Sequence, residues 1–545
     1  MKNKIHMLNS ILLVLMFTGV NTLWATDYYV SSSGLDTNNG TSETTPWKTI
    51  TKANQVLIAG DIVYIKAGTY NSYIAPNNSG TLSKPITYRN YSSDAVTISN
   101  TTRGIFLSGK SYITVTGINF YNLDTFMYLQ NGANHNIISY CTFNYGRSNS
   151  WAGSQIYPNS SYNWIHHCTF STYGGCDPGH GSGSDSGCLL DIGNDEDGTD
   201  TSHYNVVEDS IFYHGGHHLV GLISRYNTLR NNYLHNDAWS NGRGERNLYM
   251  AGVTTATGYN LVEGNRFGYS SQTCNDSSPT VGSVAMSTGY NIFRYNNIYH
   301  SVAYGLGLYS YYGSGTQYAS GSYNKVYNNT IFNSGYNIPQ DYAGGEEDSA
   351  IYVSTSYTTG NLIKNNLLYE YYNNWKTASA AARQTFANNW SGDTQGDPKF
   401  VNASTTPPVD KTDAALPNLS LQSSSPVIDK GGALTTVTSA TGSGTSIILA
   451  DASYFQAGTY GPAGVVKADW IAVGTVTNVV QISSISGNTI NLANSISWTN
   501  GASVWLYKKS DGVRVLYGAA PDAGAYEFTQ AQAPSPPQNL TVISP

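Results

Sequence analysis

The sequence predicts an all-β solenoid, a fold in which one short structural unit is stacked many times. The main observation is a repeated phrase: an Asn, an apolar residue one or two places on, and a second apolar residue a few places later. Eight copies start at Asn positions 136, 163, 205, 227, 260, 291, 324 and 361, which are 22 to 42 residues apart. A constant phrase with variable spacing indicates a fixed coil with loops of different length inserted between its copies.

Composition supports an extended β protein. The chain has 545 residues, with 55 Gly and 44 Tyr, and only 11% charged residues. Its hydrophobic content of 40% is enough to bury a large core, and its net charge is −7. Without a basic run, nucleic acid is not expected as a partner. A surface of Asn, Ser, Thr, Gly and Tyr suits contact with sugars, and it equally suits any extracellular β protein.

The N-terminus predicts a secretory signal over residues 1–25. Lys2 and Lys4 supply the positive region, residues 11–20 are mostly apolar, and Ala25 ends a plausible cleavage site. No other stretch reaches the ~18 apolar residues of a membrane helix. We therefore expect a secreted or cell-surface protein without a membrane span.

Residues 27–70 predict the N-terminal cap of the solenoid. A strand is expected at 27–30. Thr45 as N-cap and Pro46 as first residue begin a helix that Gly60 ends, and a strand follows at 61–65. Because a solenoid needs its open end covered, this amphipathic helix is expected to lie across the first coil. The β-helix with its cap is assigned to residues 26–432.

The repeated phrase predicts two features of each coil, an Asn that stabilises a corner and a residue that faces outward. The leading Asn side chains should stack from coil to coil and bond to the backbone at a corner. A second strand in each coil has an outward residue between two inward apolar ones. The expected outward row is Tyr128, Tyr157, Asp191, Gly221, Tyr249, Ala285, Gly307 and Tyr352. Its tyrosines suit sugar binding, and strand preference alone explains them about as well.

Five cysteines are present. Cys141 and Cys168 occupy the same place in successive phrases and should be neighbours, either as buried thiols or as a disulfide. Cys176 and Cys188 flank a Gly/Ser-rich loop and are the better disulfide candidates in an oxidising compartment, which leaves Cys274 over.

The C-terminal part departs from the repeat. Residues 433–517 contain alternating β runs and predict a small inserted β module. Residues 518–530 return to the β-helix tail. Residues 531–545 read as a Pro-rich linker and the start of a truncated domain that looks like fibronectin type III.

The sequence resembles the secreted right-handed parallel β-helix proteins of the pectate-lyase-like superfamily, including relatives of chondroitinase B and alginate lyases. The resemblance lies in DYYVSSSGLDTNNGTSETTPWKTITKA, in AGDIVYIKAGTY, in the repeated phrase, and in the tail motifs DPKFVNA, LSLQSSSPVIDKGG and APDAGAYEF. It implies a right-handed parallel β-helix. It implies activity less specifically, because such β-helices carry lyases, hydrolases and proteins without a known reaction.

The resemblance also indicates a departure from the alginate-lyase pattern. In proteins of the alginate-lyase type, a Lys acts as the base and an Arg is its partner. The corresponding positions in this sequence hold Ser224 and Ala251. Moreover, no Lys occurs between Lys110 and Lys325, so a Lys base in the central coils is excluded.

Two charged clusters are candidates for chemistry. The first comprises His218, Arg246 and Asp191, expected on adjacent coils, together with His217, Asp237, Arg243 and Glu245. Here His218 would be base or acid, and the arginines would neutralise a substrate carboxylate. Tyr309 joins the tyrosines of the outward row and His217 as a candidate for substrate binding.

The second cluster is an acidic loop that contains Asp195, Glu196, Asp197 and Asp200. These carboxylates could supply oxygen ligands for Ca²⁺, and a solvated acidic loop without a metal explains them equally well. Since His-x-His spacing is absent, the sequence does not predict zinc.

Three functions remain open. The preferred hypothesis is a lyase that cleaves an acidic, uronate-containing polysaccharide by β-elimination. A glycoside hydrolase would instead use Asp191 with Glu245 or Asp237 as its carboxylate pair. A non-catalytic, glycan-binding or adhesive β-helix is the third. A monomer is expected in each case.

Overall fold

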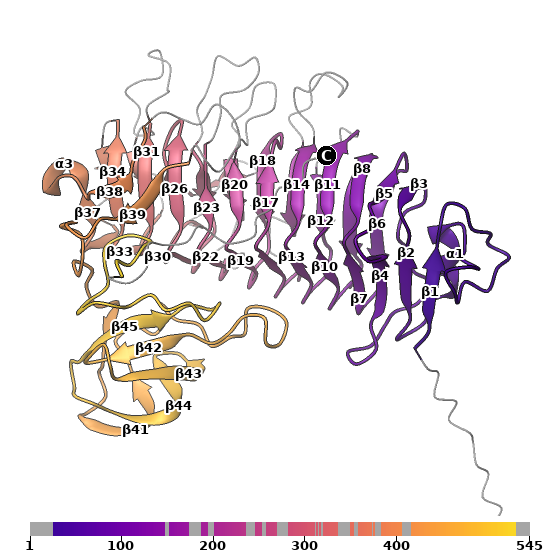
Figure 1. The fold of residues 1–545 in the computed structure, drawn as a ribbon. Helices are drawn as coiled ribbons and strands as arrows, with labels where there is room; N and C mark the ends of the chain where they lie inside the picture. The colour runs from indigo at the N-terminus through magenta and orange to yellow at the C-terminus, as the bar shows by residue number, and fades with distance from the viewer. Residues whose placement is uncertain are drawn as a thin grey trace, which may run out of the picture.

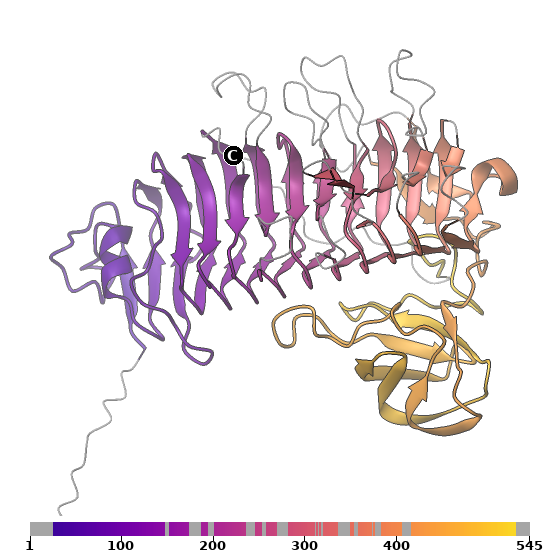
Figure 2. The ribbon, with the colours of Figure 1, turned by 180° about the vertical axis from the view of Figure 1, so that it is seen from behind.

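The computed structural model has three long parallel β-sheets that wind together into a solenoid (Figures 1 and 2). It describes residues 25–147, 152–173, 187–193, 201–235, 246–252, 258–269, 282–310, 312–313, 316–317, 320–335, 349–353, 358–372, 374–376, 383–405 and 416–529. The predicted signal (1–25), apart from Ala25, and the predicted linker (531–545) lie outside these residues. No helix in the described ranges has the length and apolar character to cross a membrane.

Sheet A has 13 strands among the described residues: β1 (Asp27–Val30), β2 (Ile62–Ile65), β4 (Ile86–Asn90), β7 (Ile113–Thr116), β10 (Ile137–Ser139), β13 (Trp164–His166), β16 (Val206–Glu208), β19 (Thr228–Arg230), β22 (Leu261–Glu263), β25 (Ile292–Arg294), β30 (Lys325–Tyr327), β33 (Leu362–Lys364) and β36 (Thr385–Ala387).

Sheet B has 12 strands in the same ranges: β3 (Gly68–Tyr70), β5 (Val96–Ser99), β8 (Asn119–Leu123), β11 (Thr142–Gly146), β14 (Thr169–Tyr173), β17 (Ile211–Tyr213), β20 (Tyr233–His235), β23 (Arg266–Phe267), β26 (Asn297–Ser301), β31 (Thr330–Ser334), β34 (Leu367–Tyr371) and β37 (Trp390–Ser391).

Sheet C, with 10 described strands, carries the candidate site: β6 (Arg103–Ser108), β9 (Thr125–Gln130), β12 (Ala152–Ile156), β15 (Cys188–Ile192), β18 (His218–Leu222), β21 (Arg246–Met250), β24 (Val284–Met286), β27 (Leu306–Leu308), β32 (Ser349–Val353) and β35 (Asn374–Lys376). In all three sheets, each strand pairs in parallel with the strands of the coils before and after it. The predicted β-helix is therefore confirmed.

The core consists of equivalent residues stacked from coil to coil. Phe120, Phe143, Phe170 and Phe212 pack ring on ring, with centroids 4.6 to 4.8 Å apart. Each is fully buried. Since parallel strands repeat at about 4.8 Å, aromatic rings at one position of each coil meet face to face. The stacking explains why the apolar positions of the phrase recur.

The leading Asn residues form the predicted ladder. From Asn136 onward, the backbone N–H of each leading Asn donates to the Oδ1 of the next one, and so does its side-chain Nδ2, except that Asn227 and Asn260 donate from Nδ2 to backbone carbonyls. Gln384 takes the place of Asn after Asn361. A second ladder, which we did not predict, runs through Asn232, Asn265, Asn296, Asn329, Asn366 and Asn389.

Aromatic residues, most of them directly before a leading Asn, form a ladder along one corner of the coils. From Tyr112 and His135 through Tyr162, Tyr204, Tyr226, Tyr259, Tyr290 and Tyr323, successive rings stack with centroids 4.9 to 5.6 Å apart. All eight residues have φ between 54 and 62°. Left-handed backbone is unfavourable for aromatic residues, so the stacking and the Asn ladder together hold the chain in this corner.

The N-terminal cap differs from the prediction in where its helix begins. Helix α1 spans Ile50–Val56, and Thr49 is its N-cap, with a side chain that accepts a hydrogen bond from Lys52 N at 3.1 Å. Thr45 and Pro46 precede the helix and are not part of it. The reason is Trp47, which is 2% exposed and exchanges backbone hydrogen bonds with Tyr29 and Ser31. That bridge to β1 delays the helix by one turn.

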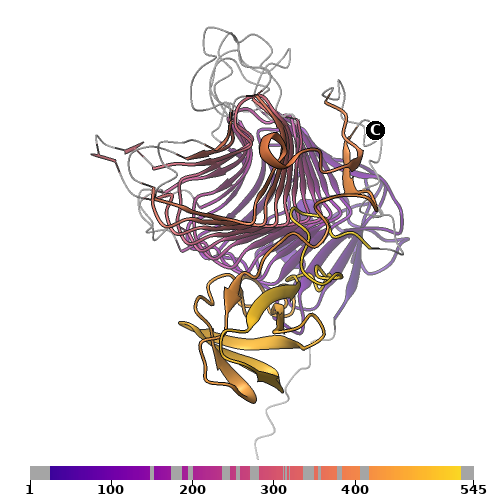
Figure 3. The same cartoon turned by 90° about the vertical axis from the view of Figure 1, so that its left-hand side faces the viewer.

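Residues 435–508 contain a separate antiparallel sheet: β40 (Thr435–Thr436), β41 (Gly442–Ile448), β42 (Trp470–Val473), β43 (Val479–Ser486), β44 (Thr489–Trp498) and β45 (Ser503–Lys508). This C-terminal module lies beside the later coils (Figure 1), and the end view in Figure 3 shows it on one side of the β-helix. Afterwards the chain returns to the β-helix, where Ala525 N donates to Thr330 Oγ1 at 2.9 Å. The minor elements are β28 (Tyr312–Gly313), β29 (Thr316–Gln317), α3 (Gly392–Gln395), β38 (Phe400–Asn402) and β39 (Asn418–Leu421).

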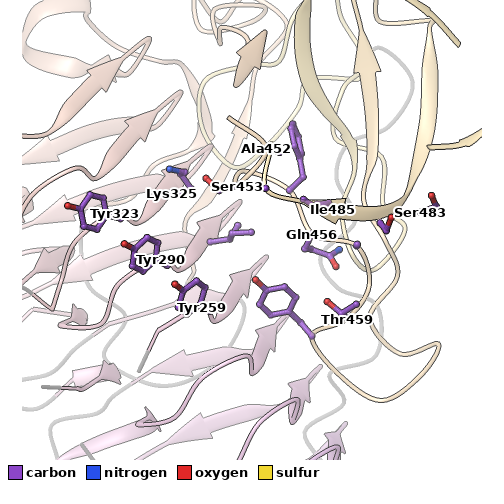
Figure 4. A pocket seen from close by; sticks show the side chains of 16 residues that line it. Tyr259, Tyr290, Tyr323, Lys325, Ala452, Ser453, Gln456, Thr459, Ser483 and Ile485 are labelled. Atoms are coloured by element: carbon purple, nitrogen blue, oxygen red, sulfur yellow. The ribbon is translucent and has the colours of Figure 1, made fainter. Parts of the chain in front are cut away.

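A cleft lies between the module and the tyrosine corner of the β-helix. Figure 4 shows Tyr259, Tyr290 and Tyr323 in a row on one side, and Gln456 and Ile485 on the other. Its cavity volume is about 360 Å³. Of the predicted catalytic residues, those that the structure describes, Asp191, His218 and Arg246, do not line this cleft.

Candidate active site

Three neighbouring strands of sheet C position the candidate site. The register aligns Asp191 of β15 with Gly221 of β18, and Gly221 with Tyr249 of β21. Three residues earlier on the same two strands, His218 is aligned with Arg246. Three of the residues predicted to share a site, Asp191, His218 and Arg246, therefore do lie on adjacent coils.

Asp191 and His218 form a buried hydrogen-bonded pair. His218 Nε2 lies 2.6 Å from Asp191 Oδ1, and the side chains are 0% and 2% exposed. The second oxygen, Asp191 Oδ2, is buried and has no hydrogen-bond partner among the described residues. A buried carboxylate is costly unless it is hydrogen-bonded, so the contact with His218 stabilises Asp191 in this position.

His217 extends the pair towards the surface. Its Nδ1 lies 2.9 Å from His218 Nδ1, and its side chain is half-buried, in contrast to the fully buried His218. If His218 Nε2–H donates to the Asp191 carboxylate, His218 Nδ1 must accept, and His217 Nδ1–H then donates to it. That tautomer puts the lone pair of His217 on Nε2. Of the two histidines, His217 is the half-buried one, whereas His218 is fully buried.

A cation and an aromatic ring complete this cluster. The Arg246 guanidinium lies 4.8 Å from the centroid of the Tyr249 ring. That ring lies 5.4 Å from His218 and 6.0 Å from His217, centroid to centroid. Arg246 Nε is buried and has no hydrogen-bond partner within the described ranges, and no described carboxylate forms an ion pair with Arg246. This cation can therefore bind an anionic ligand.

Cys188 brings a third kind of donor to the cluster. Its Sγ lies 3.5 Å from His218 Nδ1, and one ligand atom each of Cys188, His217 and His218 lies within 4.8 Å of the others. Burial raises the pKa of the Cys188 thiol well above its usual value, and the charge of Asp191 adds to this. Sulfur and imidazole donors suit zinc or copper, not calcium.

The cysteines correct one sequence expectation. Cys141, Cys168 and Cys188 are free, buried thiols, so the candidate Cys176–Cys188 disulfide does not form, and Cys141 and Cys168 are neighbouring thiols. Cys176 and Cys274 themselves lie outside the described residues. Sequence reasoning missed Cys188 as a site residue, although its place three residues before Asp191 in one strand was a usable signal.

The outward row needs a second correction. The register runs through Tyr128, Gln155, Asp191, Gly221, Tyr249, Ala285, Gly307 and Tyr352, so that Gln155 occupies the place predicted for Tyr157. Ser154 and Ile156 are fully buried and fix this alignment. Tyr157 follows the strand. The row is also less open than expected, because Asp191 and Ala285 are buried and its tyrosines are half-buried.

The remaining predicted residues divide into two groups. Tyr309 follows β27 and packs on Tyr352, with centroids 5.1 Å apart. The others lie outside the described residues: Asp237, Arg243 and Glu245 of the catalytic set, and Asp195, Glu196, Asp197 and Asp200 of the calcium set. For a hydrolase, Asp191 is poorly placed as a flanking carboxylate, because it is buried and bonded to His218.

Comparison with known proteins supports the β-helix. Residues 28–215 match a family described as Pel9A-like, right handed beta helix region. The uncharacterized protein YwoF of Bacillus subtilis (strain 168) is 41% identical over 95 residues, which are 17% of this chain. The matched part is 20% of that relative, so the chain spans about a fifth of its length.

Two solved structures are also similar. A rhamnogalacturonan lyase is 17% identical, with a TM-score of 0.46, over 72% of this chain and 97% of that one. The pectate lyase Pel9A is 15% identical, also with a TM-score of 0.46, over 76% of this chain and 92% of that one. Likenesses of this degree carry no argument about activity. From the family match and the three parallel sheets, we conclude that this chain folds as a right-handed parallel β-helix whose residues 28–215 match the Pel9A-like, right handed beta helix region.

Proposed function

We propose that the protein is a secreted polysaccharide lyase that cleaves an acidic, uronate-containing glycan by β-elimination. The observation that carries this proposal is the hydrogen-bonded chain from Asp191 through His218 to His217, with Arg246 on the paired strand. It combines a positioned base with a cation that has no described carboxylate partner. Those are the two groups that removal of a proton next to a carboxylate requires.

The roles follow from the geometry. Arg246 binds the uronate carboxylate and stabilises the negative charge that develops when the C5 proton leaves. His217 Nε2 takes that proton, while Asp191 and His218 orient His217 and disperse its new positive charge, as positioning residues. The C4–O bond then breaks, C4 and C5 become doubly bonded, and the leaving oxygen takes a proton from the Tyr249 hydroxyl or from water. The products are an unsaturated uronate and a new reducing end.

Two further expectations belong to this proposal. The signal-like residues 1–25 favour secretion, which fits a polymeric substrate outside the cell. Calcium binding by Asp195, Glu196, Asp197 and Asp200 stays a prediction. Calcium would supply a second cation at the substrate carboxylate, and dialysis against a calcium-selective chelator followed by calcium addition tests it.

The decisive experiment is a panel of uronate-containing and neutral polysaccharides. Ultraviolet absorbance of the unsaturated product and the release of reducing ends are followed together. A lyase produces both in equal amounts. Reducing ends without absorbance would mean hydrolysis, and retention on a glycan column without either product would mean a binding protein.

Two variants assign the products to the site. His217→Gln removes the base and should lower kcat at least 100-fold with little change in KM, because general base catalysis contributes about 10² to 10⁴. Arg246→Lys keeps the charge but loses the planar guanidinium, and should raise KM as well as lower kcat. Tyr121→Phe, a change at an exposed position on sheet B, is the matched control and should act as wild type.

A further inference from the structure

We propose that Cys188, His217 and His218 form a binding site for one transition-metal ion of the zinc class. This site goes beyond the proposed lyase function and does not depend on it. It requires only that the three side chains converge, as they do on β15 and on the start of β18.

The distances between the donor atoms fit one small ion. Zinc binds thiolate at about 2.3 Å and imidazole at about 2.0 to 2.1 Å with tetrahedral angles, which puts sulfur and nitrogen roughly 3.6 Å apart. Cys188 Sγ and His218 Nδ1 are 3.5 Å apart. His217 Nδ1 and His218 Nδ1 are 2.9 Å apart, and a tetrahedral site needs roughly 3.4 Å. A small rotation of the half-buried His217 ring provides the difference.

A second observation points to a metal ligand. Histidines that bind metals commonly donate their other ring N–H to a carboxylate, which fixes the ring and the tautomer. The pair His218 Nε2 and Asp191 Oδ1, 2.6 Å apart, is such an arrangement, and it directs Nδ1 towards Cys188 and His217. Since Leu190 of β15 pairs with Val220 of β18, the donors of both strands stand on a rigid support.

Charge also favours an ion at this place. The buried Asp191 carboxylate has one oxygen without a hydrogen-bond partner among the described residues, so the local charge is only partly compensated. Binding would exchange the thiol proton for the metal, so affinity should rise with pH. Three protein ligands leave a fourth position for water or for an oxygen of a ligand.

Metal binding has a consequence for the proposed reaction, and this part rests on the proposed function. The lone pair of His218 Nδ1 accepts from His217 in the metal-free form and would bind the ion in the loaded form. The two arrangements exclude each other. A loaded site should therefore have less lyase activity than an empty one, which makes zinc an inhibitor rather than a cofactor.

Cobalt(II) provides the direct test, since cobalt bound to thiolate has a charge-transfer band in the near ultraviolet. The full chain is stripped with a chelator and titrated with Co²⁺, without any glycan. The expected result is one equivalent bound, a thiolate band and the visible bands of tetrahedral cobalt. Addition of Zn²⁺ should remove these bands by displacement.

Three variants locate the ion. Cys188→Ser should abolish the thiolate band, and His217→Gln should weaken binding at least tenfold. Cys141→Ser alters another buried free thiol, far from both histidines in sequence, and should leave the titration unchanged. Circular dichroism confirms that each variant is folded. Retention of the band in Cys188→Ser, or absence of the band in folded wild type, would overturn the site.

The two proposals fail separately. A cobalt band without any lyase product refutes the proposed function and leaves the metal site standing. Lyase activity without a cobalt band refutes the metal site alone. If both are present, zinc titration of the lyase assay decides whether occupancy inhibits, and undiminished activity at full occupancy would refute the inhibition.

Discussion

Asp191 and His218 meet directly beside Gly221, a residue without a side chain. A Cβ at position 221 would lie 2.3 Å from Asp191 Oδ1 and 2.7 Å from His218 Nε2. Both distances are shorter than any van der Waals contact. The 2.6 Å hydrogen bond of the pair therefore requires glycine in the strand between them.

Gly221→Ala should consequently separate the pair while leaving the coil intact. We expect kcat on the substrate identified by the polysaccharide panel to fall at least tenfold, because His217 loses its oriented partner, and KM to change little. The cobalt site should weaken too. Gly442→Ala, in β41, is the control, since the nearest atom to a Cβ there is 3.8 Å away. Equal activity of the two variants would contradict the positioning role of the pair.

The C-terminal module is joined to the β-helix by a buried ion pair. Arg294 of β25 donates from Nη1 and Nη2 to the two carboxylate oxygens of Asp469, each at 2.7 Å, and also contacts Glu263. All three side chains are fully buried. Asp469→Ala removes one carboxylate from the buried Arg294 guanidinium, so its positive charge is less well neutralised. We expect the free energy of docking between the module and the β-helix to weaken by about 3 to 5 kcal/mol.

Limited proteolysis measures this loss. In Asp469→Ala, cleavage near residue 433 should be much faster than in wild type, while the β-helix stays resistant. Glu43→Ala is the control, since it breaks an ion pair with Lys66 whose side chains are 45% and 26% exposed, and exposed ion pairs contribute little to stability. Similar cleavage rates in both variants would mean that other contacts hold the module.

The Asn ladder predicts a large stability loss from a small change. Asn260 Oδ1 accepts from Asn227 N at 2.9 Å, and its Nδ2 donates to Ser224 O at 3.0 Å. Asn260→Ala leaves both backbone groups buried without partners, at about 1 to 3 kcal/mol each. Chemical denaturation should show a loss of about 2 to 6 kcal/mol. Asn491→Ala, which removes only an exposed bond to Ser484, should cost less than about 0.5 kcal/mol.

The fold could be predicted because the repeated phrase is the physical cause of the coil. Each leading Asn and the aromatic residue before it make contacts with their own copies, so the pattern is visible in one dimension. The second ladder leaves an equally regular signal, an Asn five places after the first in every phrase from Asn227 onward. It was missed because only the first Asn was followed.

The site could be predicted only in part, for a different reason. Asp191, His218 and Arg246 were grouped because charge is sparse and their coils are adjacent. The strand register then decides which side chain faces which. Side chains along a strand alternate with a period of two, so an alignment shifted by two residues has the same pattern of inward and outward positions. Such a shift placed Tyr157 where the structure has Gln155. The convergence of Cys188 with His217 depends on how two strands begin, which no spacing rule contains.

Histidine 300 provides a test of acid sensitivity. His300, in β26, is 2% exposed, and Asn333 Nδ2 donates to its Nδ1. Burial lowers the pKa of His300 from 6.5 to about 4. A proton added at Nδ1 would displace the Asn333 donor and place a charge in the core. The folded protein therefore binds this proton less readily than the unfolded chain does.

The sign of the effect follows from linkage. The contribution of His300 is complete above pH 6.5 and declines as the pH falls towards 4, where it is lost. The decline can reach about 3 kcal/mol, at 1.36 kcal/mol per pKa unit. His300→Asn removes the titration and tolerates the left-handed backbone there, with φ at 56°. Its free energy of unfolding should vary less than that of wild type between pH 6.5 and 4. Parallel curves for the two proteins would show that His300 does not couple folding to pH.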